Sequence, residues 1–177
     1  MNLSQLSFMK PMKMSQLIKD VEIKYTEWFV GKPDFLKHYT RKVIGIDPGK
    51  NFGAGIIINN NIIIRNGVLD DKKYPLRDIA FYYMQELCKE FEPDVVVIEG
   101  ASYGDRFGQV KLAEVRCGFA LGASEKGFPV IIIAPKTPRK TVFGSGDKGA
   151  MDVWPTINHN AADALCLALY PLFKEAT

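Results

Sequence analysis

From Arg41 onward the sequence alternates between short β-branched runs and longer segments with helical spacing, and this alternation restricts the fold more than any other feature. The β-rich runs cover residues 43–47, 53–58, 62–68, 95–98 and 129–134. Apolar residues at helical spacing cover residues 76–91, 109–126 and 157–173. The order β-β-β-α-β-α-β-α predicts an α/β fold with a mixed five-stranded sheet and helices on its faces. We expect residues 129–134 to form a buried strand.

The first 40 residues differ from the rest of the chain, with scattered Met, Lys and aromatic residues. An amphipathic helix is expected from about Ser15 to Val30. We therefore divide the chain into an N-terminal basic and aromatic extension, residues 1–40, and one domain, residues 41–177. Residues 1–42 carry eight Lys and Arg against four Asp and Glu, although the net charge of the chain is only +3. Binding of a polyanion and a solvated surface helix both explain this excess.

Composition restricts the class of protein. With 47% hydrophobic and 24% charged residues over 177 positions, the chain has the balance of a soluble globule with its own core. Its three cysteines, Cys88, Cys117 and Cys166, are odd in number and far apart, which suggests neither a disulfide framework nor a zinc site. No run approaches the roughly 20 apolar residues of a membrane span. We expect a protein of the cytoplasm, in a cell or a virus-infected cell, with no membrane contact.

Three acids stand at the ends of predicted elements. Asp47 ends the first strand before the turn Pro48-Gly49, Glu99 ends the run 95–98, and Asp163 lies near the start of the last helix. They converge if the two strands are neighbours and the helix packs across their ends. Each acid taken alone is better explained by a turn, a strand end or a helix cap. Together they predict a site.

Carboxylate clusters of this kind suit Mg²⁺ or Mn²⁺, which prefer oxygen ligands. Two such ions about 4 Å apart activate a water and stabilise the leaving oxygen during attack on a phosphate. The expected chemistry is therefore metal-dependent hydrolysis of a phosphodiester.

These residues resemble the RuvC-like Holliday-junction resolvases. Gly45–Gly49 resembles the first motif of that family, Val97–Glu99 the second, and Ala161–Leu165 its C-terminal catalytic helix, over about residues 42–170. The resemblance implies an RNase H-like nuclease domain at residues 41–177 and a homodimer. It also implies a crossover junction endodeoxyribonuclease of DNA recombination and repair. Such an enzyme uses Mg²⁺, for which Mn²⁺ substitutes, to cut four-way and related branched DNA by paired nicks with 5′-phosphate ends.

One position departs from the family pattern. Three residues before the last acid the family usually has an acid or a histidine, and this chain has Asn160, whose amide binds metals without charge. His159 lies four residues before Asp163 and shares its helix face. We assign His159 and Asn160 to positioning the water or the phosphate. The expected metal ligands, for two ions, are Asp47, Glu99, Asp163 and Asn160.

Two segments are candidates for DNA contact. The loop after Glu99 carries three candidates, Tyr103, Arg106 and Phe107, and resembles the place where the family has an aromatic near the site. Aromatics there stack on unpaired bases, although Phe107 is equally explained as a helix anchor. A basic segment that resembles one used against DNA phosphates adds Lys136, Arg139, Lys140 and Lys148, while its Gly-Ser-Gly stretch is equally a connector.

Other functions fit part of the pattern. A YqgF-type RNase H-like nuclease acting on RNA shares the strand-end acids. A junction-binding protein without catalysis is consistent with Asn160. The Asp-x-Gly turn also occurs in the actin and sugar-kinase ATPases, which are about twice as long, so a small nucleotide-binding protein is a third alternative. The helix over residues 109–126 is rich in small residues and is expected to pack on the sheet or on another subunit.

Overall fold

The computed structural model describes residues 23–31, 34–70, 72–101, 109–147, 149–152, 154 and 157–175. Within these ranges six strands form one mixed sheet: β1 (Lys24–Gly31), β2 (Val43–Asp47), β3 (Asn51–Ile58), β4 (Asn61–Val68), β5 (Val95–Glu99) and β6 (Val130–Ile133). Their order across the sheet is β1-β4-β3-β2-β5-β6. The strands β2, β3 and β4 pair antiparallel, whereas β5 and β6 run parallel to β2.

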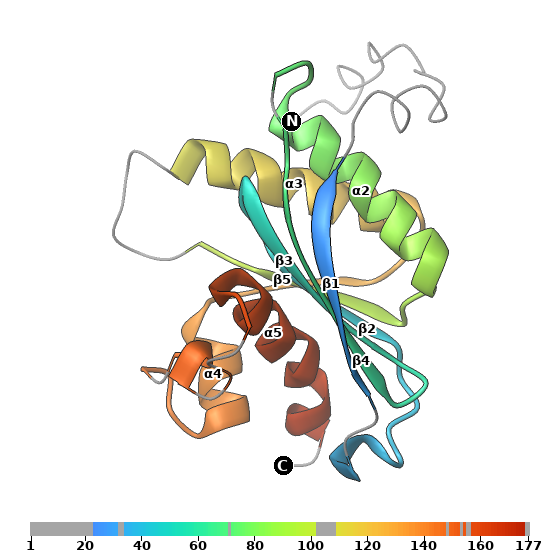
Figure 1. The fold of residues 1–177 in the computed structure, drawn as a ribbon, viewed down its shortest axis with the longest axis vertical. Coiled ribbons are helices and arrows are strands. Elements are labelled where there is room, and N and C mark those ends of the chain that lie inside the picture. Colours follow the sequence, from blue (N-terminus) through green and yellow to red (C-terminus); the bar gives the residue numbers. More distant parts are fainter. Residues whose placement is uncertain are drawn as a thin grey trace.

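Helices cover both faces of this sheet (Figure 1). One face carries α2 (Leu76–Phe91) and α3 (Gln109–Glu125), and the other carries α4 (Lys136–Phe143) and α5 (His159–Glu175). An apolar core fills each interface, around Phe52 and Phe119 under α2 and α3, and around Val97 and Leu165 under α5. The predicted α/β architecture is therefore confirmed. No helix among the described residues is long and apolar enough to cross a bilayer.

The N-terminal segment contributes a strand where we expected a helix. Residues 24–31 form β1, antiparallel to β4, with Glu27 opposite Arg65. The segment is rich in aromatic and β-branched residues, which favour strands, and its pairing covers an edge of β4 that would otherwise be open. The sheet therefore has a sixth strand. The rest of the expected helix lies outside the described residues, and the domain division at residue 40 stays a prediction.

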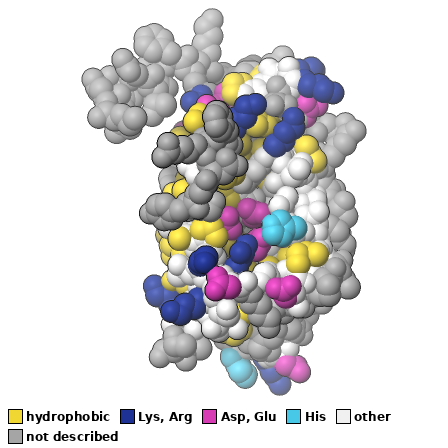
Figure 2. All heavy atoms as spheres, turned by 90° about the vertical axis from the view of Figure 1, so that its left-hand side faces the viewer, with side chains coloured by type: hydrophobic (Ala, Val, Ile, Leu, Met, Phe, Trp, Pro, Cys, Tyr) yellow, Lys and Arg dark blue, Asp and Glu magenta, His cyan; other side chains and the backbone are white. Residues whose placement is uncertain are grey.

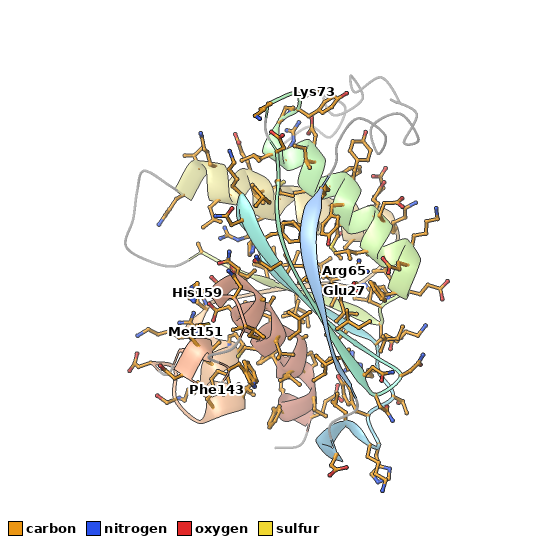
Figure 3. All side chains as sticks on the ribbon, viewed as in Figure 1. Glu27, Arg65, Lys73, Phe143, Met151 and His159 are labelled. Carbon is orange, nitrogen blue, oxygen red and sulfur yellow. The ribbon has the colours of Figure 1, made fainter. Side chains whose placement is uncertain are left out.

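Arg65 ties this added strand to the body of the fold. Its guanidinium is buried and forms ion pairs with Glu27 on β1 and with Glu90 on α2, the latter at 2.7 Å (Figure 3). It also lies 5.0 Å from the ring centroid of Phe91. The Arg65 guanidinium thus connects β1 and α2, two elements that lie far apart in the sequence.

Three further details differ from expectation. The strand β6 is an edge strand, so Ile131 and Ile132 are 41% and 55% exposed and the strand is not buried as predicted. The small residues of α3 meet α2, since a Cβ added at Gly118 would lie 2.2 Å from the Arg77 carbonyl oxygen. The short helix α4 was not predicted, because Pro138 is its one buried residue and no apolar periodicity marks it.

Candidate active site

The pleat of the sheet puts Asp47 and Glu99 on the same face. Side chains alternate along a strand, and Ile46 and Ile98 point into the core under α2 and α3. The next residues, Asp47 and Glu99, therefore point to the α5 side. Because β2 and β5 are parallel neighbours with Ile46 opposite Ile98, the two carboxylates lie level at the carboxyl ends of adjacent strands.

Three glycines allow α5 to cross these strands at very short range. A Cβ added at Gly45 would lie 2.3 Å from the Ala164 carbonyl oxygen, and one at Gly55 would lie 2.7 Å from the same atom. A Cβ at Gly53 would lie 2.0 Å from the carbonyl oxygen of Asn160. Gly45 pairs with Gly55, so the two strands together form a flat glycine surface under the helix. This contact fixes the depth and rotation of α5 over the sheet.

The docked helix brings the third acid to the other two. Asp163 is buried on α5. Burial, then the charge of Asp163, raises the pKa of Glu99 to about 7. Burial, then Glu99 and Asp163, raises the pKa of Asp47 well above its usual range. The three predicted acids therefore form one electrostatic cluster. Acidic side chains gather near the middle of the face in Figure 2, with Lys and Arg side chains above and below them.

Arginine and histidine side chains already contact this cluster. Arg139 on α4 donates from Nη2 to Oδ1 of Asp163 at 2.9 Å, and Nε2 of His159 lies 3.3 Å from Oδ2. Both oxygens of Asp163 thus have partners. Arg116 on α3 donates from Nε to the Glu99 carbonyl oxygen at 2.7 Å, and burial lowers its pKa. We did not predict Arg116; an arginine among the small and apolar residues of that helix was its only signal.

Asn160 is held in the first turn of α5 beside the acids. Its Nδ2 donates to the Asn51 carbonyl oxygen at 3.0 Å, at the start of β3. Its backbone N–H donates to Oδ1 of Asn158 at 2.9 Å, the contact of a helix cap. The side-chain donor therefore faces the sheet, and its carbonyl oxygen is the atom left for a ligand.

The donor set has the chemistry of a site for a hard divalent cation. Carboxylate and amide oxygens are what Mg²⁺ prefers, and the pKa values of Asp47 and Glu99 are raised by burial and then by neighbouring negative charge, which a cation would offset. Among the described residues, however, no three His, Cys, Asp or Glu side chains are arranged to hold an ion as they stand. Asp163 instead pairs with Arg139 and His159.

The predicted DNA contacts fall into two groups. Lys140 is exposed on α4, and Lys136 on the same helix pairs with Asp147 at 2.8 Å, both side chains being exposed. Arg139 points to Asp163 and so belongs to the acid cluster as well as to the basic helix. The other four, Tyr103, Arg106, Phe107 and Lys148, lie outside the described residues.

The fold, with acids at the ends of two neighbouring strands, is similar to that of RuvC nucleases in both sequence and solved structures. The chain is 28% identical over 147 residues to the crossover junction endodeoxyribonuclease RuvC of Bartonella bacilliformis, across 72% of this chain and 88% of that protein. The structure of Thermus thermophilus RuvC matches 76% of this chain and 95% of its own, with a TM-score of 0.61 and 21% identity.

Two further structures show the same likeness in fold. Thermus thermophilus RuvC in complex with a Holliday junction substrate matches 77% of this chain and 95% of its own, with a TM-score of 0.60 and 19% identity. The match to the yeast mitochondrial Holliday junction resolvase Ydc2 covers 80% of this chain and 83% of that protein, with a TM-score of 0.51 and 14% identity. No family model matches the chain. The resemblance to RuvC-like resolvases that the motifs indicated is confirmed in both sequence and fold.

Proposed function

We propose that the protein is a structure-selective endodeoxyribonuclease that resolves four-way and related branched DNA junctions. The observation that carries the proposal is the cluster of Asp47, Glu99 and Asp163 at the carboxyl ends of β2 and β5, where burial and then the neighbouring acids raise the pKa values of Asp47 and Glu99. Buried like charges destabilise a fold, and their close approach suits a site that takes up cations. The likeness to RuvC supports branched DNA as the substrate.

The ligands we assign to Mg²⁺ or Mn²⁺ are Asp47, Glu99, Asp163 and Asn160. Two ions, when bound, would lower the pKa of a water and stabilise charge on the phosphate oxygens. Arg139 has to release Oδ1 of Asp163 before that oxygen becomes a ligand. The released guanidinium, on the exposed basic helix α4, is then free to pair with a backbone phosphate.

His159 and Arg116 complete the proposed machinery around the acids. The imidazole of His159 is 68% exposed and touches Asp163, so it stands between the buried acid and solvent. It is placed to orient a water or to accept its proton. Arg116 holds the main chain at Glu99 through its hydrogen bond, which makes it a positioning residue for that carboxylate.

Paired nicks require two sites, and α3 offers a surface for a second copy. One face of that helix carries an exposed apolar stripe made of Val110, Cys117 and Leu121. The spacings between these residues, seven and then four positions, place them on the same side of the helix. The half-exposed Ile131 and Ile132 of β6 add apolar surface at the adjacent edge of the sheet. Monomers rarely expose such a combination, so we assign this surface to a symmetric homodimer.

The test is a substrate panel with a labelled four-way junction, a linear duplex and an RNA–DNA hybrid, each in Mg²⁺, Mn²⁺ and EDTA. We expect paired nicks in the junction alone, with 5′-phosphate ends, and no cleavage in EDTA. Preferred cleavage of the hybrid would replace the proposal with a nuclease acting on RNA. Tight junction binding without nicking in either metal would identify a binding protein.

A further inference from the structure

A basic cleft lies outside the residues assigned so far. It measures about 390 Å³ and lies between the segment after β4 and the first turns of α3. Its charged lining consists of Lys72, Lys73, Lys111 and Glu114, and Tyr74 and Leu76 form part of its wall. Tyr74 and Leu76 pack into the core under α2 and α3, so the wall is fixed while the lysines stay exposed.

The topology places this cleft at the same edge of the sheet as the acids. Antiparallel pairing through β3 makes β4 run parallel to β2, and Asp47, Gly53 and Asn66 lie level across the three strands. The segment with Lys72 and Lys73 therefore leaves β4 at the carboxyl-terminal edge. Two strand spacings separate β4 from β2, which is about 10 Å.

Lys111 lines the cleft from α3, the helix that contacts the acid site through Arg116. It lies five residues before Arg116, which contacts the Glu99 carbonyl oxygen, and this corresponds to about 7.5 Å along the helix axis. In Figure 3 Lys73 lies at the upper end of the molecule, and His159, which contacts Asp163, lies below it. Arg139 on the basic helix α4 contacts Asp163, and Figure 2 shows Lys and Arg side chains both above and below the acidic side chains of that face.

The charges in the cleft are available to a ligand. Over the part of the chain that the structure describes, the ammonium groups of Lys72, Lys73 and Lys111 form no ion pair, and Glu114 is the one acid in the lining. The lysines come from two elements and do not converge on one point. A repeating polyanion fits such a spread of charge better than a single small anion does.

We propose that this cleft holds backbone phosphates of the substrate DNA, several nucleotides from the bond that is cut. The inference rests on the proposed nuclease function and adds a second contact region to it. At about 3.4 Å per nucleotide, the 10 Å between β4 and β2 corresponds to about three nucleotides, and the reach of the segment beyond β4 adds a few more. The cleft binds phosphate and reads no base sequence.

The test compares two triple variants with the same change of charge. One is Lys72→Gln/Lys73→Gln/Lys111→Gln, and the control is Lys37→Gln/Lys89→Gln/Lys126→Gln, whose lysines are exposed and line neither the cleft nor the acid cluster. Junction binding is measured in EDTA over a range of salt concentrations. Loss of three phosphate contacts should weaken binding about 10- to 100-fold near 0.1 M salt and reduce the log–log salt slope by about 2 to 3.

A second measurement locates the contact on the DNA. Single methylphosphonates, which remove the charge of one phosphate, are introduced at one to eight nucleotides from the cut. Wild type should lose affinity when the change lies about three to six nucleotides away, and the cleft variant should not. The cleft proposal would be overturned if the cleft variant bound the junction as tightly as wild type, or if the control variant lost as much affinity as the cleft variant. In both cases the proposed function would still stand, provided that wild type binds the junction. If wild type binds no junction at all, both proposals fail.

Discussion

At the residue scale, neutralising one acid should separate cleavage from binding. Asp47→Asn removes a proposed ligand without adding bulk, so we expect cleavage of a four-way junction to fall by on the order of 10²–10³ or more. Junction affinity in EDTA should be unchanged or slightly tighter, because a negative charge beside the phosphates is lost. Single-turnover cleavage and a gel-shift titration measure the two. Glu92→Gln on the exposed end of α2 serves as control. Parallel loss of binding and cutting would contradict the assignment.

Glu99 should make the metal-free protein less stable as the pH rises. Its pKa is raised to about 7 in the folded state, mainly by burial, from an ordinary value of 4.5. The folded state therefore binds more protons than the unfolded chain between these values, and the free energy of unfolding falls as the pH rises from 4.5 to 7. At about 1.4 kcal/mol per pKa unit, this carboxyl contributes a loss of roughly 3 kcal/mol. Asp47 acts in the same direction.

Urea unfolding in EDTA at pH 5 and pH 8 measures this effect. Glu99→Gln should lose less stability than wild type between the two pH values, and it should be the more stable protein at pH 8. Added Mn²⁺ should stabilise wild type more at pH 8 than at pH 5, because ligands bind metal in their deprotonated form. Identical pH profiles for wild type and Glu99→Gln would show that Glu99 is an ordinary exposed carboxyl.

The acids could be predicted from the sequence because their positions are local signals. Asp47 and Glu99 end continuous β-branched runs, and Asp163 interrupts an apolar helix. The contact between Arg139 and Asp163 could not be predicted, because it depends on where α4 packs against α5. The eight residues of α4 show no apolar periodicity from which that packing could be inferred. Whether the three acids, His159 and Asn160 act as assigned stays a prediction.

At the scale of elements, the contact between α5 and the glycine surface sets the geometry of the site. In Gly45→Ala the new Cβ would lie 2.3 Å from the Ala164 carbonyl oxygen and 2.4 Å from the Ala168 nitrogen, both backbone atoms of α5. The helix has to move away, carrying Asp163 with it. We expect a loss of about 3 kcal/mol of stability. A shift near 1 Å should lower cleavage by on the order of 10²-fold.

The matched control is Gly149→Ala. There the added Cβ would meet the Asp152 carboxylate at 3.3 Å, a side chain that can turn aside. Thermal unfolding and single-turnover cleavage of both variants test the idea. If Gly45→Ala were as stable and as active as Gly149→Ala, close docking of α5 would not determine where Asp163 lies.

The elements that could be predicted are those whose burial follows from their own sequence. The hairpin of β3 and β4 was marked by Asn59 and Asn60, and both have positive φ, of 49° and 65°. By contrast, β1 was mistaken for a helix because its neighbour β4 lies about 30 residues further along the chain. Whether a segment forms a strand depends on the strand it pairs with, whereas the apolar face that α2 buries can be read from its own sequence.

At the scale of the whole molecule, the paired nicks that we propose require two copies of the proposed site, and therefore a dimer. An isologous interface brings the same residues of both copies together near the two-fold axis. The stripe of Val110, Cys117 and Leu121 has its cysteine in the middle, and Cys117 is exposed while Cys88 and Cys166 are buried. If α3 pairs with its copy near the centre of the stripe, the two Cys117 thiols lie close to each other.

Mild oxidation should therefore cross-link wild type into a covalent dimer through Cys117. We expect Cys117→Ser to remain monomeric on a non-reducing gel, although it should still be a dimer by light scattering. Leu121→Glu places a charge on the stripe and should shift the protein to monomer, and it should convert paired nicking into single nicks at lower rate. Cross-linking that persists in Leu121→Glu at the same rate would show random collision, because a disrupted interface no longer holds the two thiols together.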